Sequence, residues 1–221
     1  MRKLLIGALG CLAMCLSTAA SAVVITLTFE GVGNSCSINN FYNGGTDSCG
    51  NSGTNYGVGF GANALGLVDA DAGGSGNFGN EPTPDTIMFF LTGSAVLNFG
   101  AGFTDGFSFF YTSTSFPGSV SVWSGLDATG VLLGTIDLAA LGTGPGDPSG
   151  AFSNWEIGFL AFAGTAMSID FGGTVNQIGF DNITFGSTDP RPPQIPEPAT
   201  LALLGIALAG LGFASRRRPT K

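Results

Sequence analysis

Apolar and polar residues alternate with a period of two in several short runs between residues 23 and 185. Such alternation is typical of β-strands with one buried face. The apolar positions that share a face in successive runs are Val23, Ile25, Leu27 and Phe29; Phe107, Phe109 and Tyr111; Val120 and Val122; Trp155, Ile157 and Phe159; and Met167, Ile169 and Phe171. Gly- and Pro-rich turns separate these runs, and none has a convincing helical period. The pattern predicts an all-β domain, and we expect a jelly-roll-like β-sandwich.

The last of these runs, residues 177–185, changes parity part of the way along. Ile178 and Phe180 share one face, whereas Ile183 and Phe185 fall on the opposite parity. A strand with a period of two can keep all four on one face only through an extra residue. The sequence therefore predicts a β-bulge near Asp181 and Asn182.

The two ends of the chain have patterns of a different kind. Residues 1–22 carry a charged start, an apolar run and an A-x-A site, which indicates a secretory signal peptide. The exported domain is expected to span residues 23–189, followed by a Pro-rich linker at 190–195. Residues 199–214 form an uncharged apolar run, about 24 Å long as a helix, near the lower limit for crossing a bilayer. The arginines after it are expected to stay on the cytoplasmic side of the inner membrane.

Residues 196–221 combine three features in a fixed order: Pro196, Glu197 and Pro198, then the predicted transmembrane helix, then Arg216, Arg217 and Arg218. This combination closely resembles the PEP-CTERM sorting signal of bacterial surface and exopolysaccharide-associated proteins. The resemblance implies that an exosortase, a membrane peptidase, recognises and processes the tail. It also implies export through the inner membrane, transient anchoring there, and then a place at the cell surface or in the extracellular matrix.

The charge of the exported domain is one-sided. Residues 23–189 contain no lysine, arginine or histidine, while every acidic residue of the chain except Glu197 lies within them. Nucleic acid is excluded as a direct partner because nothing could neutralise its phosphates, and anionic lipid is excluded for the same reason. An acidic surface instead favours divalent cations and neutral polymers.

Two cysteines, Cys36 and Cys49, remain once the signal peptide is removed. An even number of cysteines in an exported chain favours one disulfide, here closing a loop of about a dozen residues. A zinc site is the other interpretation, but two cysteines without histidine do not complete one.

The missing residue types exclude most catalytic chemistry. Without histidine or lysine, the exported domain holds no Ser-His-Asp or Cys-His arrangement, and the chain has no phosphate-binding Gly-Lys-Ser/Thr motif. Glycoside cleavage by two carboxylates stays open as the alternative function. The candidate acids are Asp69, Asp71, Glu81, Asp85 and Glu156. We expect a non-catalytic domain, since nothing in the sequence pairs these acids across a cleft.

Residues 27–30 and 179–183 resemble the first and last strands of jelly-roll sugar-binding modules, which often hold a structural calcium between two acids. The resemblance implies that Glu30 and Asp181 bind Ca²⁺, with other oxygens completing the six to eight ligands that calcium takes. Exposed aromatic side chains are the features expected of a glycan-binding surface. Trp123 is the main candidate for a glycan contact, with Tyr42 and Tyr56 in polar stretches. Together these features favour a surface or matrix protein that binds extracellular polysaccharide.

Overall fold

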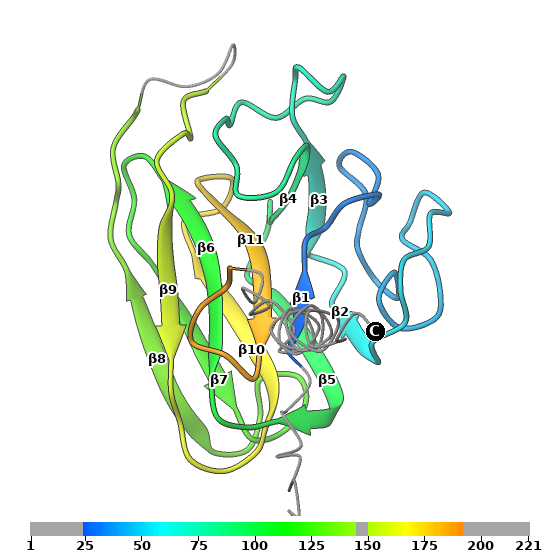
Figure 1. The fold of residues 1–221 in the computed structure, drawn as a ribbon, viewed down its shortest axis with the longest axis vertical. Helices are drawn as coiled ribbons and strands as arrows, with labels where there is room; N and C mark the ends of the chain where they lie inside the picture. The colour runs from blue at the N-terminus through cyan, green and yellow to red at the C-terminus, as the bar shows by residue number, and fades with distance from the viewer. Residues whose placement is uncertain (1–23, 145–149, 192–221) are drawn as a thin grey trace, which may run out of the picture.

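A computed structural model describes residues 24–144 and 150–191 of the chain (Figure 1). The expected signal peptide, tail helix and sorting motif lie outside these residues, as does nearly all of the linker. No helix of the described part is long and apolar enough to cross a membrane. The strands are β1 (Ile25–Leu27), β2 (Val58–Phe60), β3 (Leu65–Val68), β4 (Thr86–Phe89), β5 (Ala95–Phe103), β6 (Phe107–Ser113), β7 (Gly118–Trp123), β8 (Leu132–Leu138), β9 (Glu156–Leu160), β10 (Ala166–Gly173) and β11 (Ile178–Phe185).

The strands form two antiparallel sheets, as the alternating sequence pattern predicts. One sheet has the order β3-β4-β11-β6-β9, with β1 also paired to β11, and the other has the order β2-β5-β10-β7-β8. Most neighbours within a sheet are distant in sequence. A chain that connects strands in this way brings its first and last strands, β1 and β11, side by side.

Phenylalanine rings from both sheets meet in a single core. Phe171 of β10 makes edge-to-face contacts with Phe107 and Phe109 of β6 and with Phe180 of β11. All four rings are fully buried. Edge-to-face pairs add about 0.5–1.5 kcal/mol each to the burial of their surface, so this cluster locks the two sheets together.

Strand β9 corrects one expectation about which side chains face the core. Phe159 is 59% exposed, whereas the neighbouring Gly158 is buried. Gly158 pairs with Phe109 across the sheet, and an added Cβ there would collide with the Phe109 ring. The large Phe109 side chain therefore fills the space inside Gly158, and Phe159, on the opposite face of β9, is turned away from the core.

The bulge predicted in the last strand is confirmed. The pairing of β11 with β6 shifts register between Asp181 and Thr184, so that one extra residue is accommodated. Phe180 lies in the core before the shift, and Ile183 and Phe185 lie there after it. Asn182, at the bulge, has a left-handed backbone with φ of 49°. The bulge keeps the apolar residues inside while turning Asp181 away from them.

The disulfide between Cys36 and Cys49 is also confirmed. The loop that it closes is stabilised in addition by hydrogen bonds to Asp47. The buried carboxylate of Asp47 accepts hydrogen bonds from the backbone amides of Gly33, Cys49 and Asn51 and from the Asn51 side chain. Burial by itself raises the pKa of Asp47, but these hydrogen bonds outweigh burial and hold the pKa below its ordinary value. Asp47 therefore acts in this loop as an anion.

Replacing Asp47 with Asn should cost about 1–2 kcal/mol of unfolding free energy at neutral pH, because one acceptor oxygen is lost and the other bonds lose their charge. The folded-state pKa of Asp47 lies below the unfolded value of about 3.9, so its contribution is present above that pH and is lost as the pH falls. Urea unfolding at pH 7 and pH 3 should thus separate the two proteins more at pH 7. Equal separation at both pH values would contradict a charged role for Asp47.

Candidate functional site

The candidate site forms where β11 changes its neighbour within the sheet. Phe180 pairs with Met88 of β4, whereas Ile183 pairs with Leu27 of β1. The bulge at Asp181 falls between these two pairings. Figure 1 shows β1 and β4 one above the other beside β11, with the break between them. The chain leaves β1 at this break, through Thr28 to Glu30, and it also enters β4 here at Thr86.

Asp181 is fully buried in the break, and its carboxylate is bound on both oxygens. Its Oδ2 accepts hydrogen bonds from the backbone amide of Thr83 at 2.9 Å and from the Thr83 hydroxyl at 2.8 Å. Its Oδ1 accepts one from the amide of Asn182 at 2.7 Å. Thr83 lies between Pro82 and Pro84, which restrict the backbone of this loop and so reduce the entropy lost on holding Thr83 against Asp181.

Several oxygen atoms converge on the Thr83 hydroxyl. Besides Asp181 Oδ2, it lies 3.1 Å from Asn182 Oδ1 and 3.4 Å from the carbonyl oxygen of Thr28. A hydroxyl has one hydrogen and cannot donate to three acceptors at once. The excess of oxygen acceptors over donors makes this point of the structure electron-rich.

Glu30 follows β1 at the same break, where its Oε1 accepts a hydrogen bond from the amide of Thr86 at 3.0 Å. Burial raises the pKa of Glu30 to about 7; the hydrogen bond from Thr86 opposes this, and the charges of Asp85 and Glu81 add to it. Burial likewise raises the pKa of Asp181 to about 7, against the hydrogen bonds from Thr83 and Asn182, and the charge of Glu30 adds to the effect. The structure thus brings the two acids into one electrostatic environment that disfavours their charged forms.

The described residues supply no cation to this environment. Between residues 24 and 190 the sequence has no lysine, arginine or histidine, and the Arg191 guanidinium pairs with the exposed carboxylate of Asp189 at 3.3 Å. The hydrogen bonds compensate the two desolvated carboxylates in part, and protons or a bound cation would compensate the rest.

The oxygen atoms at this break are of the kinds that a hard divalent cation binds. Calcium accepts carboxylate, carbonyl, amide and hydroxyl oxygens without a fixed geometry. Carboxylate ligands are available from Glu30 and Asp181, and neutral ligands from Thr28 O, Thr83 Oγ1 and Asn182 Oδ1. No group of three or more His, Cys, Asp or Glu side chains is placed to hold a metal together within residues 24–144 and 150–191. The neutral oxygens would therefore have to provide much of the coordination.

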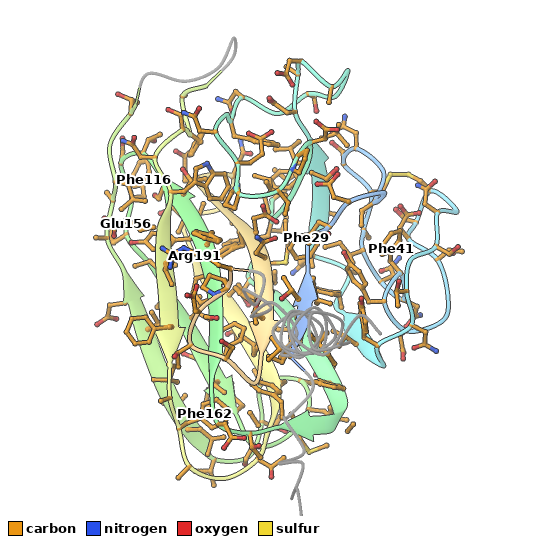
Figure 2. All side chains as sticks on the ribbon, in the orientation of Figure 1. Phe29, Phe41, Phe116, Glu156, Phe162 and Arg191 are labelled. Carbon is orange, nitrogen blue, oxygen red and sulfur yellow. A yellow bond between two sulfur atoms is a disulfide. The ribbon has the colours of Figure 1, made fainter. Side chains whose placement is uncertain are left out.

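The backbone around the site is held in an uncommon conformation. Phe29, Asp85 and Asn182 all have positive φ, at 63°, 78° and 49°. Left-handed backbone costs a non-glycine residue about 1–3 kcal/mol and is often found at functional sites. Phe29 is stabilised there because its amide donates to the Tyr42 hydroxyl at 2.7 Å and its ring packs edge-on against Tyr42. Figure 2 shows Phe29 beside β1.

The three aromatic candidates for glycan contacts have different surroundings. Tyr42 is 5% exposed, so the expectation that it is available to ligand is wrong. Its hydroxyl oxygen accepts a hydrogen bond from the amide of Phe29. Tyr56 is 36% exposed and stacks on Tyr42. Trp123 pairs with Ser168 of β10 and is half-buried, and its indole Nε1 is buried with no hydrogen-bond partner among the described residues.

The acids considered for glycoside cleavage lie in separate places, except that Glu81 and Asp85 are close together near Glu30. Asp69 is 1% exposed at the end of β3, and Asp71 is exposed in the loop that follows. Glu81 and Asp85 add to the negative potential at Glu30. Glu156 begins β9, and Figure 2 shows it on the far side of the view from Phe29.

Sequence reasoning identified Glu30 and Asp181 but missed Thr83, which donates two hydrogen bonds to Asp181. The loop that carries Thr83 is about a hundred residues from Asp181 in sequence, and only the folded sheet brings the two together. The Pro-Thr-Pro run at residues 82–84 was the available signal, since two prolines around one polar residue indicate a fixed loop.

Comparison with known protein families identifies the C-terminal region. Residues 194–218 match the PEP-CTERM protein-sorting motif, which confirms the resemblance seen in the sequence. No curated protein matches the chain significantly.

Proposed function

We propose that this exported, exosortase-sorted PEP-CTERM protein is a non-catalytic component of the extracellular polysaccharide matrix. Its domain, a sandwich of the jelly-roll kind, would be stabilised by one Ca²⁺ and would make weak contacts with glycan. Calcium would be held by Glu30 and Asp181 with the oxygens of Thr28, Thr83 and Asn182, and would neutralise the two carboxylates.

The observation that carries this proposal is the pair of desolvated acids in a domain without a single basic residue. Two such carboxylates destabilise the fold at neutral pH unless a cation accompanies them. A protein that works outside the cell meets calcium at concentrations matching the 10⁻⁴–10⁻³ M dissociation constants of extracellular calcium modules. The role given to the metal is structural, because it would join three segments of the chain: residues 28–30 after β1, the loop at Thr83 and the bulge in β11.

Two further features support a binding role over catalysis. Glycoside hydrolysis needs two carboxyl groups facing one sugar, about 5–10 Å apart. Of the candidate acids, Glu81 and Asp85 lie near Glu30, whose own carboxylate the cation would neutralise, and Glu156 lies elsewhere. The acidic surface, moreover, suits a neutral polymer and repels an anionic one.

Affinity electrophoresis tests the proposal. The mature protein, run through gels that contain the producing organism's own exopolysaccharide, should be retarded in calcium and less retarded in chelator. A set of gels with a chromogenic glycoside substrate should show no hydrolysis. Equal migration with and without polysaccharide, in both buffers, would contradict the binding role.

A further inference from the structure

A cleft lies away from the acidic site, on the side of the molecule that carries Glu156 (Figure 2). It is an open cleft of about 570 Å³ between residues 139–141, which follow β8, and residues 153–156, which lead into β9. This volume is within the usual range for small-molecule sites. The side chains that line it with polar or aromatic groups are Ser153, Asn154, Trp155 and Glu156.

Trp155 provides the cleft with a fixed aromatic surface. Its indole Nε1 donates a hydrogen bond to the carbonyl of Gly79 at 3.0 Å, which ties the ring to the loop before β4. The residue is half-buried, so part of the indole faces the cleft. An aromatic ring that is already held in place loses little conformational freedom when a ligand packs against it.

Two polar groups around the ring have hydrogen-bonding capacity left over. Ser153 is 6% exposed and its hydroxyl has no hydrogen-bond partner among the described residues. Asn154 uses its Nδ2 on the carbonyls of Leu141 and Gly142, which leaves its Oδ1 able to accept. A buried hydroxyl without a partner costs free energy that a ligand hydroxyl can recover.

Glu156 adds one negative charge at the mouth of the cleft. It is exposed and pairs with Tyr111 across the sheet. Burial, and then the charge of Glu156, raise the pKa of Tyr111, which places the carboxylate near the phenol. Carboxylates accept hydrogen bonds from paired hydroxyls, but they repel acidic ligands when, as here, no basic side chain accompanies them.

We propose that this cleft binds a neutral glycan, with a sugar ring packed on Trp155 and its hydroxyls bonded to Ser153, Asn154 and Glu156. This inference rests on the proposed function, and it moves the main glycan contact from Trp123 to Trp155. Uronic acid polymers should be rejected because their carboxylates would meet Glu156.

The chain has only two tryptophans, Trp123 and Trp155, so fluorescence can report on each separately. Trp123→Phe leaves Trp155 as the sole indole, and Trp155→Phe leaves Trp123. Each mature variant would be titrated, in calcium, with neutral oligosaccharides released from the producing organism's exopolysaccharide and with hexagalacturonate. We expect the neutral fragments to change the emission of the Trp123→Phe protein and to leave the Trp155→Phe protein unchanged. Hexagalacturonate should change neither.

Two additional measurements keep the result interpretable. Glu156→Gln should weaken binding of the neutral fragments about tenfold, because a charge-assisted hydrogen bond is lost, and leave the melting temperature unchanged. In the polysaccharide gels, Trp155→Phe should lose most of the retardation and Trp123→Phe should keep it. If the Trp155→Phe protein is retarded like the wild type, the cleft is not the glycan-binding site, while the proposed function stays intact. An unretarded wild type would overturn both.

Discussion

Removal of calcium should lower the melting temperature of the mature protein by about 5–10 °C. A ligand at a hundred times its dissociation constant stabilises the folded state by about 2.7 kcal/mol. In a domain of this size each kcal/mol shifts the melting temperature by about 2–4 °C. The measurement is a thermal melt followed by near-ultraviolet circular dichroism, in excess calcium and in calcium-free buffer with chelator.

Variants at the site separate metal binding from a general effect of salt. Asp181→Asn should melt at the same temperature with and without calcium, because the buried ligand has lost its charge. In chelator it should melt no lower than the wild type, since replacing a desolvated carboxylate also removes its repulsion with Glu30. Thr83→Val, which removes one hydroxyl and keeps the shape, should reduce the calcium-dependent shift.

The matched control is Asp137→Asn, the same chemical change on the exposed face of β8. Its calcium-dependent shift should equal that of the wild type. If the wild-type melts in calcium and in chelator coincide, the metal assignment to Glu30 and Asp181 is wrong. That outcome would not affect the proposal that the cleft at Trp155 binds a neutral glycan.

The local features of the sequence were sufficient to predict the strands but not to orient all of them. Alternation predicts which residues share a face of a strand. It also predicts the bulge at Asp181, because Phe180 and Phe185 have opposite parity and are both buried. Which face of β9 is inward depends on Phe109, a residue of another strand, and so Phe159 was placed on the wrong side. Burial of Tyr42 follows in the same way from its contact with Phe29.

The candidate site could be predicted only as far as its acids. An acid after the first strand and another in the last strand are visible in the sequence, and sheet pairing brings the two strands together. Thr83 and Thr86 belong to a loop and a strand whose position depends on the whole sheet order, so their hydrogen bonds to Asp181 and Glu30 have no local signal. The same holds for the cleft at Trp155, whose walls come from residues 139–141 and 153–156.

Without calcium, the stability of the protein should fall as the pH rises from about 4 to about 7. In the folded state the pKa values of Glu30 and Asp181 are both about 7, whereas in the unfolded chain they return to about 4.3 and 3.9. Between these values the folded protein binds more protons than the unfolded chain. The unfolding free energy therefore decreases with rising pH in this window and is lowest above pH 7.

Asp181 accounts for most of the expected change, because it is fully buried and Glu30 is partly solvated. The pKa of Asp181 is about 7 in the folded state and about 3.9 in the unfolded chain, a difference that corresponds to about 4 kcal/mol of unfolding free energy. The stabilisation by Asp47 changes with pH in the opposite direction, and this change falls below about pH 4, so the two pH windows do not overlap. Urea unfolding of the calcium-free protein at pH 4.5, 5.5, 6.5 and 7.5 measures the change.

Calcium should cancel this pH dependence, because the metal binds the charged carboxylates and its affinity increases as they lose their protons. At pH 7.5 the difference between calcium and chelator should be largest, and at pH 4.5, where both acids are protonated, it should nearly vanish. Asp181→Asn should flatten the calcium-free profile. A wild-type profile that is flat or rising between pH 4.5 and 7.5 in chelator would mean that the two carboxylates are compensated by something other than protons or metal. The described structure offers no such group, so the pH profile tests the electrostatic argument independently of whether calcium is the natural ligand.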